Sequence, residues 1–234
     1  MKRRLIIAVD GPAGAGKSSS SRLLAERLGY RYIDTGALYR AVGLLAWEQG
    51  VSPEDADGLT ALCDGLRPRF VPGAEGIRLL SGERDLTSDI RKPEVSQMAS
   101  KVSAHPLVRQ RLLALQRDLG KEGGVVMEGR DIGTVVFPDA DVKFYLDASP
   151  EERGRRRYAE LQQQGTPANL ATTVQQIAER DRRDSGREHA PLRQAAGAVV
   201  IDTTTLSLAE VVHTMTDYIR DCASGDDRRE KQPL

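Results

Sequence analysis

The segment around Lys17 most constrains what this chain can fold into. A continuous aliphatic run, Leu5–Val9, is followed almost at once by the sequence GPAGAGKS, which occupies positions 11–18. A short run that is apolar at every position is typical of a strand buried on both faces of a parallel sheet. The residues after Lys17 have the leucine spacing of a helix, which Gly29 ends. The order strand, glycine-rich turn, helix predicts an α/β protein.

The glycine-rich turn matches the pattern G-x-x-x-x-G-K-[ST] in the structural context that this pattern requires. Its glycines let the backbone wrap closely, so that successive N–H groups point at phosphate oxygens, and the following helix adds its dipole. We expect Lys17 to reach the β- and γ-phosphates and the Ser18 hydroxyl to bind Mg²⁺. The motif therefore predicts a nucleoside triphosphate with Mg²⁺ and leaves the reaction open.

The rest of the chain extends this pattern. Four further strands are predicted, at Tyr30–Ile33, Val125–Met127, Val142–Leu146 and Ala198–Ile201. Helical patterns separate them, which predicts a five-stranded parallel sheet flanked by helices. Between Leu66 and Thr87, short strand candidates alternate with Pro72-Gly73 and Ser81-Gly82, which is typical of hairpins. We therefore expect a small antiparallel insert there.

The charges sum to zero, with 34 basic and 34 acidic residues, and 27 of the basic residues are arginine. A zero balance argues against a general binder of nucleic acid, whereas arginine is suited to bidentate contacts with phosphate.

The two cysteines, Cys63 and Cys222, do not have the spacing of a metal site or a redox motif. The apolar run Leu5–Val9 is too short for a signal segment, and no stretch is long enough to span a membrane. We expect a soluble, cytoplasmic protein without nucleic-acid or membrane partners.

Two charged segments follow predicted strands, at the sheet edge where ligands bind in such folds. In the segment 34–40, Thr35 can cap a helix and Arg40 lies one turn into it; an ordinary cap with a surface arginine is an equally good interpretation. Glu128, Arg130 and Asp131 follow the strand at 125–127 and cannot be buried unpaired. A carboxylate at this position can hold Mg²⁺ through water, so we favour a functional role for this group.

Two arginine-rich helical segments bracket a polar loop at 162–169. Acidic neighbours can pair many of these arginines, so a solvated pair of helices with surface ion pairs is the expectation for most of them. A minority are expected to fold over an anion, as a lid does in small phosphotransferases.

Three classes of protein remain to be compared. A GTPase would carry a guanine-reading N-K-x-D motif, which the chain lacks. A kinase acting on a small acceptor needs a second anion pocket, for which Arg40, Arg109 and Arg130 are candidates. A regulator that hydrolyses ATP without an acceptor would not need these arginines. Among kinases, the residues themselves leave CMP, UMP and AMP open as acceptors.

The motifs together resemble one family closely, the bacterial cytidylate kinases of the nucleoside monophosphate kinase group. The segments that carry the resemblance span residues 7–207: IAVDGPAGAGKSS, YIDTGALYRA, SKVSAHPLVR, EGRDIGTVVFPDADVKFYLDASPEERGRRR, IAERDRRDSGR and VIDTTTLS. The resemblance implies a P-loop kinase core that transfers the γ-phosphoryl group of ATP, with Mg²⁺, to CMP or dCMP.

The resemblance also implies roles for individual residues. The ATP phosphates are expected to bind Gly11, Pro12, Ala13, Gly14, Ala15, Gly16, Lys17, Ser18 and Ser19. Mg²⁺ is expected to bind Ser18 and Glu128; glutamate replaces an aspartate of some members at position 128. The acceptor phosphate is assigned to Thr35, Arg40 and Arg130, cytosine to Ser100, Arg109 and Asp131, and the ribose to Asp184 and Arg187. The arginines that close over the transferred group are Arg156, Arg180 and Arg183, and Arg180 also contacts the substrate. Lys17, Arg130, Arg156, Arg180 and Arg183 form the expected catalytic set.

The expected organisation is one kinase domain over residues 1–222. It contains a monophosphate-binding insert at about 62–104 and a helical, arginine-rich lid at about 150–187. A disordered tail is expected at 223–234, and the family resemblance implies a monomer.

Overall fold

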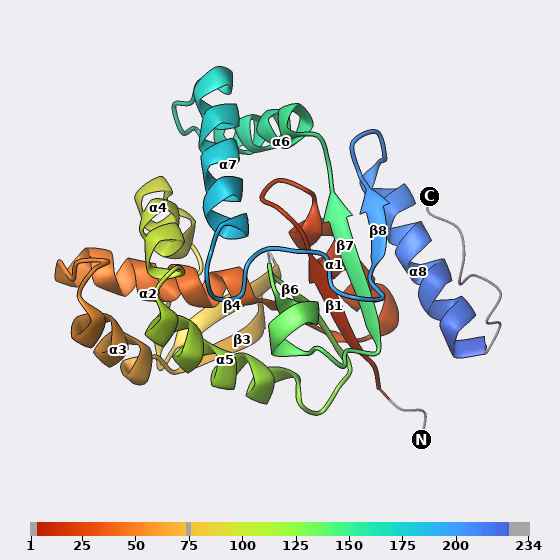
Figure 1. Cartoon of the computed structure of the whole chain (residues 1–234), viewed down its shortest axis with the longest axis horizontal. Coiled ribbons are helices and arrows are strands. Elements are labelled where there is room, and N and C mark those ends of the chain that lie inside the picture. Colours follow the sequence, from red (N-terminus) through yellow and green to blue (C-terminus); the bar gives the residue numbers. More distant parts are fainter. Residues whose placement is uncertain (1–3, 74–75, 225–234) are drawn as a thin grey trace. The chain divides into compact units, whose positions relative to one another are not determined.

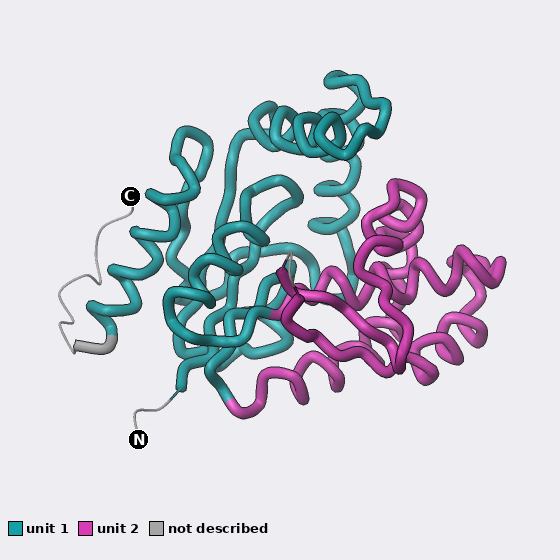
Figure 2. The backbone as a smooth tube through the Cα atoms, turned by 180° about the vertical axis from the view of Figure 1, so that it is seen from behind, with its two compact units in different colours: residues 1–32, 123–234 teal, residues 33–122 magenta. Residues whose placement is uncertain are grey.

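The computed structural model describes residues 4–73 and 76–224 of the chain (Figure 1). The chain divides into two compact units, which are coloured separately in Figure 2. Unit 1 comprises residues 1–32 and 123–234, and unit 2 comprises residues 33–122. No helix in the described part of the chain is long and apolar enough to cross a membrane.

The main sheet has five strands in the order β2-β6-β1-β7-β8, which confirms the predicted α/β fold. Their bounds are β1 (Ile6–Asp10), β2 (Arg31–Asp34), β6 (Val125–Glu128), β7 (Val142–Asp147) and β8 (Val199–Asp202). The central strand β1 pairs in parallel with β6 and β7, and its place between two neighbouring strands explains why its first four residues, Ile6–Val9, are all apolar. Each of the five strands ends in an acidic residue, so this sheet edge is lined with carboxylates.

Helices complete unit 1: α1 (Lys17–Leu28), α6 (Pro150–Gln163), α7 (Leu170–Ser185) and α8 (Leu208–Ser224), with a single π-helical turn, η2 (Ile132–Val136). The helix start expected at Ser149 is confirmed, because its hydroxyl accepts a hydrogen bond from the N–H of Glu152 at 3.2 Å. Phe144, Leu146 and Met215 belong to an aliphatic core between the sheet and the helices. The tail predicted from 223 includes the last two residues of α8; its remainder, 225–234, lies outside the described residues.

Unit 2 contains α2 (Thr35–Gln49), α3 (Ala56–Gly65), a short 3₁₀ turn η1 (Asp89–Arg91), α4 (Pro93–Val102) and α5 (Pro106–Gly120). Its antiparallel sheet β3-β4-β5 has strands Pro68–Gly73, Gly76–Ser81 and Arg84–Asp85, which confirms the predicted hairpin region. The helix α3 was not predicted. The Asp55 carboxylate caps it by accepting the N–H of Gly58 at 2.9 Å, and Leu59 and Leu62 are buried in the core of this unit.

Candidate active site

The phosphate loop (Gly11–Ser18) connects β1 to α1 and has the backbone geometry expected for binding an anion. Gly11 and Gly14 have φ values of +146° and +79°. A Cβ atom at Gly11 would lie 1.9 Å from the carbonyl oxygen of Leu146, so only glycine fits against β7. At its N-terminus α1 has no side-chain cap and no acidic residue in its first turn, as far as the described residues show. Its first N–H groups are therefore suited to a phosphate.

Lys17 is buried, and its ammonium donates a hydrogen bond to the carbonyl oxygen of Pro12 at 2.6 Å. Burial, followed by repulsion from Arg130, lowers the pKa of Lys17 to about 7, and attraction by Glu128 opposes this shift. A buried cation beside a second cation is stabilised by an additional negative charge. The electrostatics of Lys17 therefore favour a bound phosphate.

Two side chains from the second half of unit 1 hold the outer carbonyl groups of the phosphate loop. The guanidinium of Arg153, on α6, donates to the carbonyl oxygens of Ala13 at 3.2 Å and Ala148 at 2.9 Å, and also contacts Asp181 on α7. The hydroxyl of Thr203 donates to the carbonyl oxygen of Ala15 at 3.1 Å. When these carbonyl oxygens bond outward, the loop's N–H groups are left to face a ligand.

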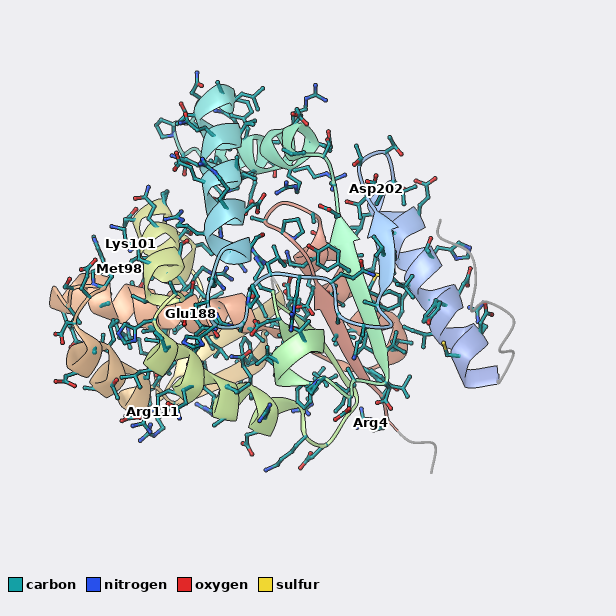
Figure 3. The ribbon with its side chains drawn as sticks, viewed as in Figure 1. Arg4, Met98, Lys101, Arg111, Glu188 and Asp202 are labelled. Carbon is teal, nitrogen blue, oxygen red and sulfur yellow. The ribbon has the colours of Figure 1, made fainter. Side chains whose placement is uncertain are left out.

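Arg156, assigned above to the catalytic set, contacts one of these two side chains, that of Thr203. It donates to the hydroxyl and the carbonyl oxygen of Thr203 at 2.9 Å and 2.6 Å, and to Glu152 at 3.1 Å. Thr203 directly follows Asp202, the last residue of β8, which is labelled in Figure 3. Arg156 therefore contacts Thr203, the residue after β8 that also holds the carbonyl group of Ala15 in the phosphate loop.

A cluster of arginines surrounds Asp184, near the end of α7. Its buried carboxylate accepts from Nε of Arg130 at 2.9 Å, pairs with Arg187, and lies 3.9 Å from Arg180. Burial raises the pKa of Asp184, but the three arginines, Arg130 foremost, outweigh it and hold that pKa below its usual value. The structure thus brings together four of the predicted residues in a group with three positive charges and one negative charge.

Arg183 lies outside this cluster. It is exposed, and with Glu179 and Arg182 it lines a shallow depression on α7.

The residues predicted to bind Mg²⁺ supply oxygen ligands. Glu128 ends β6 and is buried, with a hydrogen bond from the hydroxyl of Tyr32, whereas Ser18 is exposed at the start of α1. The described residues contain no cluster of three or more acidic, histidine or cysteine side chains that could hold a metal ion. One carboxylate with one hydroxyl nevertheless fits Mg²⁺, which keeps several waters and takes its other ligands from substrate phosphates.

In unit 2 the structure corrects the expectation that Thr35 caps α2. The cap is Asp34, whose carboxylate accepts the N–H of Ala37 at 3.0 Å. A carboxylate one residue earlier reaches this third N–H group of the helix, so Thr35 becomes the first helical residue. The same carboxylate accepts from Arg40 at 2.5 Å, which ties Arg40 to the helix start.

Ser100 on α4 and Arg109 on α5 are connected through Ser103. Arg109 is buried, donates to the carbonyl oxygen of Ser103 at 3.1 Å, and stacks over the ring of Tyr39 at 5.4 Å. The hydroxyl of Ser103 donates to the carbonyl oxygen of Ser100 at 3.0 Å. The Ser100 hydroxyl itself is buried without a hydrogen-bond partner among the residues that the structure describes. An unpaired buried hydroxyl is costly, which favours a polar ligand at this position.

Known proteins match the chain over nearly its full length. The sequence model of the cytidylate kinase family matches residues 7–221. The chain belongs to the cytidylate kinase family. A cytidylate kinase of Geobacter sp. (strain M21) is 52% identical over 223 residues, which are 95% of this chain and 96% of that relative. A cytidylate kinase of Geobacter sulfurreducens is 52% identical over 220 residues, 94% of each chain.

A solved gluconokinase from Sinorhizobium meliloti 1021 has the same fold, with a TM-score of 0.50, 17% sequence identity, and coverage of 99% of this chain and 100% of that chain. Membership of the cytidylate kinase family makes the protein a nucleoside monophosphate kinase. The recognition drawn from the sequence motifs is thereby confirmed.

Sequence reasoning missed several residues that shape the candidate active site. Arg153, in the first of the two arginine-rich helical segments, was assigned no role, although it is buried and donates to the phosphate loop. Thr203 and Tyr32 were assigned no role. A signal existed for Asp10, because it ends a buried strand at the sheet edge, as Glu128 does, and a charge there needs a partner.

Proposed function

We propose that this protein phosphorylates CMP and dCMP, using ATP and Mg²⁺, to give CDP and dCDP. The observation that carries phosphoryl transfer is Lys17, a buried cation that donates to the phosphate loop at the start of α1, a helix whose N-terminus has no side-chain cap in the described structure. Family membership supports the cytidine monophosphate acceptor. The resemblance to bacterial cytidylate kinases further supports a cytoplasmic protein that is a monomer. Sedimentation of the purified chain would test the oligomeric state.

In this proposal the acceptor phosphate oxygen attacks the γ-phosphorus of ATP in line, and the bond from that phosphorus to the β,γ-bridging oxygen breaks. No side chain forms a covalent bond, so positioning and charge compensation supply the rate. Residues 11–19 hold the ATP phosphates, and Lys17 faces the β- and γ-phosphates. Ser18 and Glu128 hold Mg²⁺, which when bound neutralises charge on these phosphates. Arg130, Arg156, Arg180 and Arg183 compensate the charge of the transferred group.

We propose that the acceptor binds through three sets of residues. Thr35, Arg40 and Arg130 bind its phosphate, while Asp184 and Arg187 bind its ribose. Asp131, Arg109 and Ser100 bind the base, because cytosine offers an amino donor beside carbonyl and ring-nitrogen acceptors. UMP would place its O4, an acceptor, against the Asp131 carboxylate, which is also an acceptor. A site that recognises its ligand by hydrogen bonds discriminates strongly against such a mismatch. The helices α6 and α7, within residues 150–187, are the proposed lid, and residues of about 62–104 are the proposed monophosphate-binding insert.

A panel of acceptors tests the proposal. Initial rates with ATP and Mg²⁺ would be measured with CMP, dCMP, UMP and AMP, and with no acceptor. We expect CMP and dCMP to have the highest kcat/KM. A CMP rate no higher than the UMP rate would contradict the cytidylate assignment, and ATP hydrolysis that is indifferent to every acceptor would favour a regulatory ATPase. Asp131→Ala is expected to lower the preference for CMP over UMP more than it raises the KM for ATP.

A further inference from the structure

Asp10, the last residue of β1, makes contacts that the proposed mechanism does not use. Its buried carboxylate accepts hydrogen bonds from two successive backbone N–H groups, those of Ile132 at 2.8 Å and Gly133 at 2.7 Å. These are the first two residues of η2. One side chain, 122 positions earlier in the chain, therefore satisfies two of the donors that the start of a helical turn leaves unpaired.

A cap of this kind normally comes from the residue immediately before the helix. Asp34, Asp55 and Ser149 cap α2, α3 and α6 in this way. The corresponding residue of η2 is Asp131, and its side chain makes no capping hydrogen bond. Asp10 therefore performs the capping that a carboxylate at position 131 would otherwise provide.

The segment around Asp131 is also attached to β1 on its other side. The N–H of Gly129 donates to the carbonyl oxygen of Val9 at 3.0 Å. Arg130 and Asp131 thus lie between two attachments to β1, one at Gly129 and one at Ile132 and Gly133. Both attachments fix the backbone, and hence the direction in which the Asp131 side chain leaves it.

We propose that Asp10 is a positioning residue for substrate recognition: it caps η2 from the neighbouring strand and so holds the Asp131 carboxylate in the orientation that selects CMP. This rests on the proposed function, because it assigns the effect of Asp10 to the reading of cytosine. A cap with a purely structural role would lower stability and affect all nucleotides alike. A positioning role changes selectivity, and only through Asp131.

A double-mutant cycle separates these roles. Asp10→Asn keeps the shape of the side chain and one acceptor oxygen, but turns an amide NH₂ toward the second backbone donor. The kcat/KM values for CMP and UMP, and the KM for ATP, would be measured for the wild type, Asp10→Asn, Asp131→Ala and the double variant. We expect Asp10→Asn to lower the CMP/UMP ratio about tenfold, with a smaller change in the KM for ATP. In the Asp131→Ala background, the Asp10→Asn substitution should change the CMP/UMP ratio of kcat/KM less than about twofold.

Asp147→Asn is the matched control. Asp147 also ends a strand of the sheet, β7, and accepts a backbone N–H, but that donor is Ala148 at 2.8 Å and not a residue of η2. We expect this variant to keep the CMP/UMP ratio of the wild type. If Asp10→Asn unfolds at the assay temperature, Asp10→Glu takes its place in the cycle, since it keeps the charge but displaces the carboxylate.

Two results would overturn the positioning role while leaving the proposed function intact. One is an unchanged CMP/UMP ratio in Asp10→Asn when Asp131→Ala lowers that ratio. The other is an equal effect of the Asp10 substitution with and without Asp131. If Asp131→Ala itself leaves the preference for CMP unchanged, the assignment of Asp131 as base reader fails, and the positioning role fails with it.

Discussion

Replacing Asp184 by asparagine removes the negative charge that Arg130, Arg180 and Arg187 share. The Asp184 side chain is 1% exposed, and those of Arg130 and Arg187 are 18% and 8% exposed, so two of the three pairs are largely shielded from water. Arg180 is 34% exposed and 3.9 Å away, and its pair contributes little. Neutralising one partner of a buried pair costs about 3–5 kcal/mol. Asparagine keeps one acceptor oxygen, so we expect a loss of about 3 kcal/mol, at the low end of that range.

Thermal unfolding measures this loss. For a chain of this size, 1 kcal/mol corresponds to about 2–4 °C, so the midpoint of Asp184→Asn should fall by about 6–12 °C. Asp217→Asn is the control, because Asp217 is 38% exposed on α8 and its partners, Arg220 at 3.0 Å and His213 at 3.1 Å, are both exposed. An exposed pair contributes at most about 1 kcal/mol, so the control midpoint should fall by less than about 4 °C.

The pH dependence gives a second measurement of the same interaction. The pKa of Asp184 in the folded protein lies below its usual value of 3.8. A carboxyl group of this kind stabilises the fold above its unfolded pKa and loses that contribution as the pH falls through its folded pKa. The difference in unfolding midpoint between the wild type and Asp184→Asn should therefore have its full size near neutral pH. It should become smaller below about pH 4. A variant that unfolds within about 2 °C of the wild type at neutral pH would refute the shared-charge account.

Three further substitutions test the phosphate loop. Lys17→Ala should lower kcat by about 10²–10³-fold or more in steady-state kinetics, while thermal unfolding should keep its midpoint, because burial and Arg130 already disfavour the charged form of Lys17 in the fold. Gly11→Ala should destabilise the fold by about 4 kcal/mol or more in denaturant titrations, since its Cβ would lie 1.9 Å from the carbonyl oxygen of Leu146. Arg153→Met should raise the KM for ATP about tenfold and change the KM for CMP less, because the phosphate loop loses its outer hydrogen bond at Ala13, while the other two partners that lose a contact, Ala148 and Asp181, lie outside the loop. An equal rise in both KM values would show that Arg153 does not act through the loop.

The parts of the fold that the sequence predicts are those with a local cause. The five strands, the loop before Lys17 and the hairpins between Leu66 and Thr87 all follow from apolar runs and turn residues that are neighbours in the chain. Two of the elements that escaped prediction show the physical reason clearly. The helix α3 has two glycines and three polar residues in its ten positions, so its apolar stripe is short. The turn η2 depends on Asp10, a residue remote in sequence, for the hydrogen bonds at its start.

The candidate site shows the same division. The phosphate loop is recognisable because its glycines, lysine and serine are consecutive. The roles of the arginines are not recognisable in this way, because composition and spacing do not reveal which carboxylate each arginine contacts. Arg130 and Arg187 converge on Asp184, whereas Arg156 binds Thr203, a residue 47 positions away. Sequence reasoning could name these arginines, but their partners are set by tertiary structure.

The acidic strand ends explain how a chain of zero net charge can hold a strongly cationic site. Each strand of the main sheet ends in a carboxylate, and most of these carboxylates accept backbone N–H groups. Asp10 accepts two from η2, Asp147 accepts one from Ala148, and Asp202 accepts one from Thr204. Among the described residues these three carboxylates form no ion pair with an arginine, although Asp10 attracts the Lys17 ammonium. Net charge counts these carboxylates against the basic residues, but the local field around Lys17 and the Asp184 cluster depends on which groups lie nearby. Overall charge therefore argues against a general polyanion surface and leaves room for a compact anion site.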